Sequence, residues 1–160
     1  MKYRLLCLLS LLLFLSGCIA GHEQVPMDDG YTTDTATDAL NYTTYVDKEL
    51  GLVMNLLATH LGNSRSALDA AELLANEIRN VSESLLLISE AIDSVDALRP
   101  PDGYEDLCEA ALRRMKEAED AVEGYQSALD LADSDAVEAA VTRMESAYVA
   151  LTGAFTVIPE

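Results

Sequence analysis

Apolar residues recur every three or four positions through most of the chain, a spacing typical of amphipathic helices. The clearest stripe consists of Ala67, Ala71, Leu74, Ile78, Val81, Leu85, Ile88, Ile92 and Val95. Two similar stripes run from Tyr104 to Leu129 and from Val137 to Ile158, and a less regular one runs from Ala39 to Leu57. No segment alternates as a strand would. The pattern predicts an all-α protein with helices at about 33–61, 64–98, 103–131 and 135–157.

Residues at the helix ends support these boundaries. Pro100 and Pro101 stop the second helix, because proline lacks a backbone donor and clashes with the preceding turn. Asn63 or Ser64 is expected to cap the start of that helix, and Asp135 the start of the fourth. His60 lies in the last turn of the first helix, where we expect it to interact with the terminal carbonyl groups.

Four amphipathic helices joined by short turns most simply form an antiparallel up-down-up-down bundle. An open helical hairpin that dimerises to complete the bundle is the alternative architecture. In the single-chain bundle, the N-terminal segment that precedes the helices (residues 18–30), the turn at 99–103 and the C-terminus lie at one end. The turns near Gly62 and Ser134 lie at the other end.

The first eighteen residues carry a targeting pattern. Lys2 and Arg4 precede an apolar run from Leu5 to Leu15, which is shorter than the roughly twenty residues that span a bilayer. The run ends in Leu15, Ser16, Gly17 and Cys18. This segment resembles the lipobox of prokaryotic lipoprotein precursors. The resemblance covers residues 1–18 only, and it implies that a lipid is attached to Cys18 and that the peptide is cut before it.

This resemblance divides the chain into three parts. Residues 1–17 are a cleaved signal peptide, residues 18–30 are a lipidated, flexible tether, and residues 31–160 are the helical bundle. We expect an extracytoplasmic protein held on the cell membrane, or on the outer membrane if the source has one. Acyl chains on Cys18, each CH₂ worth about 0.8 kcal/mol, would provide the membrane contact. The end of the bundle next to the tether should then face the membrane, and the end with the turns near Gly62 and Ser134 should face outward.

The charge narrows the range of partners. Loss of residues 1–17 removes Lys2 and Arg4 and no acidic residue, so the formal charge moves from −18 to −20. Such a chain repels phosphate backbones, which argues against nucleic-acid binding. The charge suits a solvated exterior, or attraction to basic partners or divalent cations.

The sequence lacks the motifs that bind iron or haem in helical bundles. A di-iron bundle needs Glu-x-x-His motifs, and covalent haem needs Cys-x-x-Cys-His; the sequence has neither. Cys108 lies on an apolar stripe among acidic residues, which favours a buried, inert thiol over a nucleophile. We therefore expect no catalytic residue, no cofactor and no metal.

Two glycines inside helices are less easily explained. Gly51 and Gly124 lie at similar distances from the same end of the predicted bundle, although glycine costs about 1 kcal/mol against alanine in a helix. They could leave room for a small apolar ligand, at a site made of Gly51, Met54, Gly124, Tyr125, Met144 and Tyr148. Close helix packing or simple tolerance is the more ordinary explanation.

Two functions remain open. The first is a non-enzymatic module that binds a protein of the cell envelope, with exposed apolar residues such as Leu86 and Leu87 outside the bundle. The alternative is a carrier or sensor that holds a small apolar ligand between the helices. The sequence does not define the oligomeric state.

Overall fold

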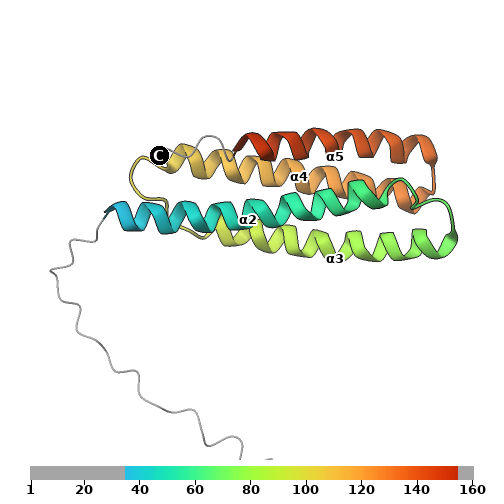
Figure 1. Cartoon of the computed structure of the whole chain (residues 1–160), viewed down its shortest axis with the longest axis horizontal. Coiled ribbons are helices and arrows are strands. Elements are labelled where there is room, and N and C mark those ends of the chain that lie inside the picture. Colours follow the sequence, from blue (N-terminus) through green and yellow to red (C-terminus); the bar gives the residue numbers. More distant parts are fainter. Residues whose placement is uncertain (1–34, 155–160) are drawn as a thin grey trace, which may run out of the picture. The chain divides into compact units, whose positions relative to one another are not determined.

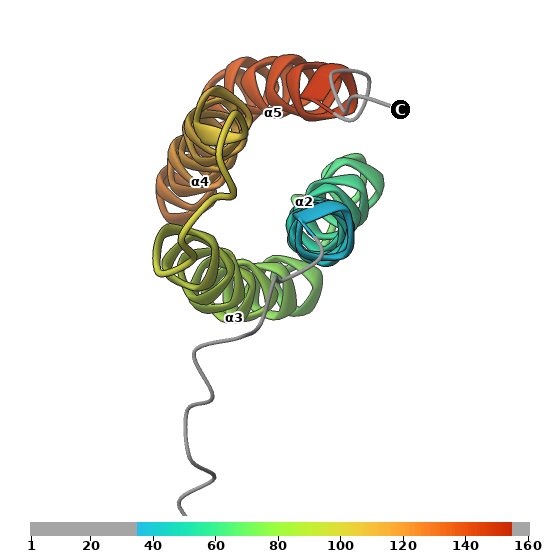
Figure 2. The same ribbon diagram turned by 90° about the vertical axis from the view of Figure 1, so that its left-hand side faces the viewer.

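A computed structural model of the chain describes residues 35–154; the signal peptide, lipobox and tether assignments lie outside them. The described residues form helices α2 (Thr35–Asn63), α3 (Ala71–Asp96), α4 (Glu105–Leu131) and α5 (Ser134–Ala154), and no strand. Each helix runs antiparallel to the next (Figure 1). Viewed end-on, α3, α4 and α5 form an arc, and α2 lies against its open side (Figure 2). The prediction of an all-α four-helix bundle is confirmed, and one chain supplies all four helices.

The predicted stripes form the core of this bundle. Each helix contributes residues that are fully or almost fully buried, among them Val46, Leu50, Val53, Leu57, Val81, Ile88, Val95, Met115, Val122, Leu129, Met144 and Leu151. Buried aliphatic side chains of this kind each contribute about 1.5–3 kcal/mol to folding. The core of α4 and α5 also contains many alanines, namely Ala111, Ala118, Ala121, Ala128, Ala140 and Ala147.

Helix α3 begins later than predicted, at Ala71 rather than near residue 64. The preceding residues form turns in which Ser64 donates its N–H to the carbonyl of His60 and Ser66 donates to Asn63. Ala67 is only 2 % exposed although it lies in this turn region. Ala67 therefore follows the apolar spacing of α3 because the turn buries it, although it precedes the helix. The expected cap by Asn63 or Ser64 is also wrong, because the N-cap residue is Ala70, without a side-chain hydrogen bond.

The predicted start of the first helix, residue 33, lies outside the described part. The ends of α2 and α3 and both ends of α4 agree with the predictions to within about two residues. At the start of α5, the carboxylate of Asp133 accepts the backbone N–H groups of Asp135 and Ala136 at 2.9 and 3.1 Å. Asp133 therefore caps α5 in place of the predicted Asp135, one residue before the helix begins at Ser134. The predicted end of this helix, residues 155–157, lies outside the described part.

The turns lie as the antiparallel topology predicts. Residues 97–104 lie at the same end of the bundle as the start of α2, and residues 64–70 and 132–133 lie at the opposite end (Figure 1). We call the latter the distal end. Its orientation away from a membrane stays a prediction.

Candidate functional site

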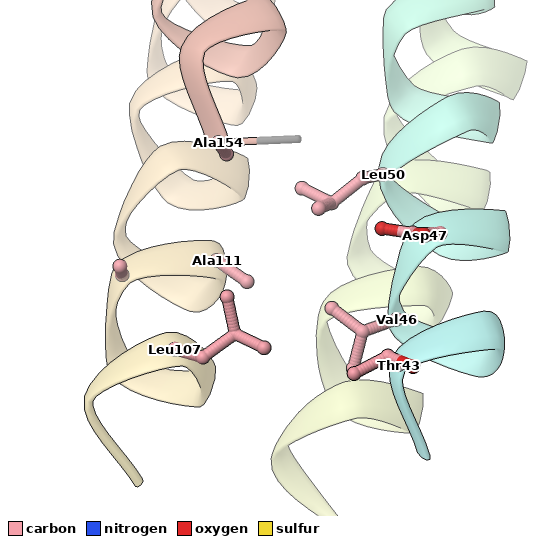
Figure 3. Close-up of a pocket in the computed structure, with 8 residues that line it drawn as sticks. Thr43, Val46, Asp47, Leu50, Leu107, Ala111 and Ala154 are labelled. Atoms are coloured by element: carbon pink, nitrogen blue, oxygen red, sulfur yellow. The ribbon is translucent and has the colours of Figure 1, made fainter. Parts of the chain in front are cut away.

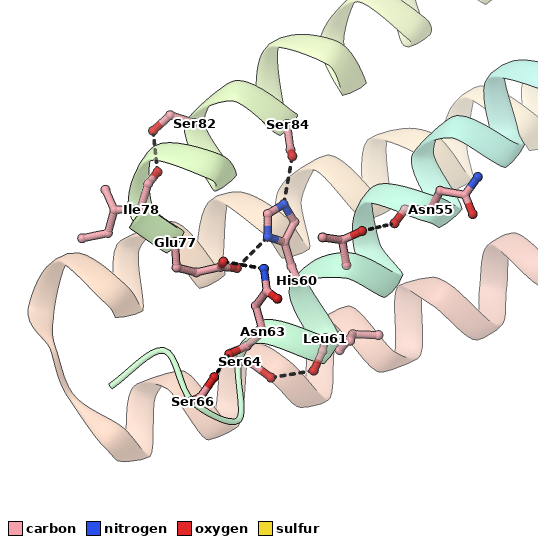
Figure 4. A network of polar contacts seen from close by, with 11 residues as sticks. Asn55, His60, Leu61, Asn63, Ser64, Ser66, Glu77, Ile78, Ser82 and Ser84 are labelled. Carbon is pink, nitrogen blue, oxygen red and sulfur yellow. Dashed lines mark hydrogen bonds and ion pairs between the residues drawn. The ribbon is translucent and has the colours of Figure 1, made fainter. Parts of the chain in front are cut away.

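A group of buried polar side chains joins α2 to α3 near the distal end (Figure 4). Nδ1 of His60 lies 2.7 Å from Oε1 of Glu77, and Nε2 of His60 lies 2.9 Å from the hydroxyl of Ser84. The side-chain amide of Asn63 donates to Oε2 of Glu77 at 2.7 Å. His60, Glu77 and Ser84 are all buried, and His60 is only 1 % exposed. We call these four residues the distal polar cluster.

The cluster satisfies its own hydrogen bonds. Nδ1–H of His60 donates to the carboxylate of Glu77, which fixes the imidazole ring. The hydroxyl of Ser84 can donate to Nε2 of a neutral ring or accept from a protonated one. Either state leaves both ring nitrogens bonded. Since a buried polar group without a partner costs about 1–3 kcal/mol, this completeness is what makes the cluster compatible with the core.

Helix α4 closes the cluster from a third side. The rings of His60 and Tyr125 have their centroids 6.2 Å apart and are tilted by 48°. Tyr125 is fully buried, and its hydroxyl has no hydrogen-bond partner among residues 35–154. Burial and, next, the negative charge of Glu77 raise the pKa of Tyr125. The imidazole of His60 therefore packs against an aromatic ring of the core.

The sequence interpretation of His60 is wrong. Instead of interacting with helix-end carbonyls, its side chain points across to α3 and binds two of its residues. The helix continues to Asn63, three residues beyond His60, and His60 lies on the buried stripe that follows Leu57. A histidine on such a stripe requires buried partners, and that requirement was the signal that sequence reasoning missed.

The connectivity of Ser84, His60 and Glu77 is that of a hydrolytic triad, in which a carboxylate orients the imidazole and the imidazole binds a hydroxyl. Such chemistry also needs free N–H donors around a developing oxyanion and room for a substrate. Ser84 lies in the middle of α3, where backbone N–H groups are bonded within the helix. Its side chain is 7 % exposed. The described arrangement therefore fits a structural role, joining α2 to α3.

The residues predicted to form a ligand pocket have different environments. Tyr125 and Met144 are fully buried in the core, and Met54 and Tyr148 pack against it half-buried. Gly51 and Gly124 are half-exposed. A Cβ atom at Gly51 would meet nothing within 4 Å, and one at Gly124 would meet only Nη1 of Arg143, at 3.8 Å. Close helix packing therefore does not require either glycine, and the ligand pocket stays a prediction.

A small cavity lies instead between α2 and α4, beside the last described residue of α5 (Figure 3). Its volume is about 20 Å³, and its lining residues are Thr43, Val46, Asp47, Leu50, Leu107, Ala110, Ala111 and Ala154. Oδ1 of Asp47 is buried without a hydrogen-bond partner in the described part of the chain. Burial raises the pKa of this carboxyl group. The cavity has room for about one water-sized molecule.

Larger depressions are open to solvent. A pocket of about 150 Å³ adjoins the distal polar cluster and is lined by Asn63, Ser66, Ala67, Leu73, Asn76, Glu77 and Asn80. A groove of about 480 Å³ separates the outer edges of α4 and α5, with Arg114 and Arg143 among acidic and small residues. Acidic and basic residues are mixed in this groove, so it presents no uniform charge to a ligand.

Cys108 is a free, buried thiol, as predicted. The ring of Tyr42 packs edge-on against Tyr104, with centroids 6.2 Å apart. Burial and, next, the neighbouring Cys108 raise the pKa of Tyr42. Cys108 is 8 % exposed and also lines an open depression of about 550 Å³, in which Arg113 and Lys116 lie among acidic residues.

Comparisons with models of protein families, with curated proteins and with solved structures gave no match to this chain. Among residues 35–154, no helix is long and apolar enough to cross a membrane. No three His, Cys, Asp or Glu side chains in that same range are grouped closely enough to hold a metal ion.

Proposed function

We propose that the protein is a lipid-anchored extracytoplasmic lipoprotein whose helical bundle is a non-enzymatic module for binding another envelope protein. The observation that supports a binding role is the exposure of Leu86 and Leu87 on the surface of α3, at 67 % and 42 %. Single exposed apolar residues are common on soluble domains. Leu86 and Leu87 lie outside the apolar stripe of α3, so they are not needed to fill the core.

The buried polar residues support the same proposal indirectly. The side chains best suited to chemistry, in the distal polar cluster, bond to one another, and His60 packs against the buried ring of Tyr125. The apolar side chains best suited to contact with a protein lie outside. The bundle thus offers a surface more readily than it offers a reaction site.

The anchor is tested by expressing the full chain in a bacterium, with or without Cys18→Ala, and feeding an alkyne-labelled palmitate. We expect label on the wild-type chain and its recovery with membranes. Cys18→Ala should lose the label, and any chain that is still cut should become soluble. Label that persists on the variant would contradict the lipobox assignment.

The binding role is tested by cross-linking in cells of the source organism. A photoreactive residue at position 87 of the full chain should give a discrete cross-linked protein. The same residue at exposed Leu131, at the end of α4, serves as the matched control. Equal and diffuse products from both positions would argue against an interaction module.

A further inference from the structure

The outward surface of α3 combines the two exposed leucines with acidic residues in a regular arrangement. Glu83, Leu86, Leu87, Glu90 and Asp93 are all exposed, and we call them the α3 outer face. Glu83 precedes the leucines by three and four residues, and Glu90 follows them by four and three. Residues three or four apart are neighbours on a helix surface. Each leucine is therefore bracketed by a carboxylate above and below it.

We infer that the α3 outer face binds a basic amphipathic helix of a partner protein, which would pack along α3 as a fifth helix. The inference rests on the proposed role as an interaction module and adds the surface and the class of partner. Glu83 and Glu90 lie seven residues apart, roughly 10 Å along the helix. A matching partner carries lysine or arginine at that spacing, with apolar residues between them to cover Leu86 and Leu87.

Charge distinguishes this partner from other occupants. The α3 outer face holds three acidic residues and no basic one; Arg79, one turn earlier, donates to Asn76. A second copy of the chain would bring identical acidic rows together across a two-fold interface, where like charges oppose association. An anionic lipid surface is repelled for the same reason. A basic helix instead gains both the charge attraction and the apolar contact.

The test uses the full chain purified in neutral detergent and a synthetic 18-residue helix with a leucine stripe flanked by lysines. A scrambled peptide of the same composition retains the charge and lacks the stripe. Leu86→Gln/Leu87→Gln removes the apolar centre of the α3 outer face without changing its charge. Leu131→Gln is the matched control, since Leu131 is 73 % exposed and lies on α4.

We expect the double variant to bind the amphipathic helix at least about tenfold more weakly than wild type, because it loses the apolar contact that both leucines provide. Leu131→Gln should bind as wild type does, and the scrambled peptide should bind all three proteins equally weakly. Equal binding of the amphipathic helix to all three proteins would overturn the inference. So would a dimer of the chain that the double variant abolishes, because the face would then belong to a second copy. Neither result bears on whether the chain cross-links to an envelope protein in cells, so the proposed function would fail separately.

Discussion

The two helix pairs of this bundle are held together by different means. Where α2 meets α3, a histidine, a glutamate, a serine and an asparagine bond to one another beside the aliphatic stripe. In α4 and α5, alanines such as Ala118 and Ala140 are frequent among the buried residues, and these two helices pack against each other most extensively. Directional hydrogen bonds set the alignment of the first pair, whereas small side chains set the close approach of the second.

The comparison teaches how each pair can fail. A hydrogen-bonded cluster fails when one member is removed, because the others stay buried without partners. A contact made by alanines fails when a side chain grows, because the space is already filled. The first kind of pair is sensitive to chemistry and the second to volume.

The largest effect is expected from breaking the distal polar cluster. Glu77→Ala leaves His60 without its carboxylate and should lower the free energy of unfolding by about 3 kcal/mol, the usual cost of removing one member of a buried pair. Urea unfolding followed by circular dichroism measures the change. Glu90→Ala, at an exposed position of the same helix, should change it by less than about 0.5 kcal/mol.

A triple replacement distinguishes two contributions to stability: the cost of leaving buried polar groups without partners, and the stabilisation that the intact cluster provides. His60→Leu/Glu77→Leu/Ser84→Ala should unfold within about 1 kcal/mol of wild type, because apolar residues often replace a buried polar group without loss. A triple variant as unstable as Glu77→Ala would show that the cluster itself stabilises the α2–α3 pair.

The second prediction enlarges a side chain on α4. Ala118 is fully buried, and Ala118→Leu should lower the free energy of unfolding by about 2 kcal/mol through overpacking. Ala139→Leu, at an exposed position of α5, adds the same volume to the surface and should be nearly neutral. If both variants unfold as the wild type does, the core around Ala118 is packed more loosely than this comparison assumes.

The third prediction replaces with alanine the glycine that lies inside one helix of each pair. Gly51→Ala in α2 and Gly124→Ala in α4 should each raise the free energy of unfolding by about 1 kcal/mol, the difference in helix propensity. The structure provides space for both Cβ atoms. Destabilisation at either site would instead point to a close contact or a ligand that requires glycine there.

The sequence predicts features that lie within one helix better than it predicts contacts between two helices. The spacing of Val81, Leu85 and Ile88 is a property of one helix, so it predicts the buried side of α3 directly. The bonds of His60 join residues 17 and 24 positions away, so they depend on the alignment of two helices. No periodicity within one helix contains that alignment.

The misplaced start of α3 has a related cause. Ala67 is buried, as its place in the stripe predicts, but it is buried by a turn that folds over the end of the bundle. Periodicity reports which side chains are covered and does not distinguish a helix from a turn that covers the same core. The late start of the helix follows from the backbone bonds of residues 64–70.

The smallest effect is expected at Asp47 of α2, whose carboxylate lacks the hydrogen-bond partners that the residues of the distal polar cluster have. One carboxylate oxygen is buried without a partner, whereas both oxygens of Glu77 are bonded. Because burial raises the pKa of Asp47 above its ordinary value of 3.8, the folded protein holds the proton more tightly than the unfolded chain does. The charged carboxylate therefore lowers stability at neutral pH. Asp47→Asn, which cannot ionise, should melt at a slightly higher temperature than wild type at pH 7.

The pH dependence identifies the cause of this gain. As the pH falls through the raised pKa, the wild-type carboxyl group becomes neutral in the folded state, and the advantage of Asp47→Asn should shrink. It should vanish below about 3.8, where the group is also protonated in the unfolded chain. Melting curves of the two proteins between pH 3 and pH 7 measure the difference. An advantage that stays constant with pH would mean that the amide gains a contact of its own. Loss of stability in Asp47→Asn at pH 7 would mean that the carboxylate is paired in solution.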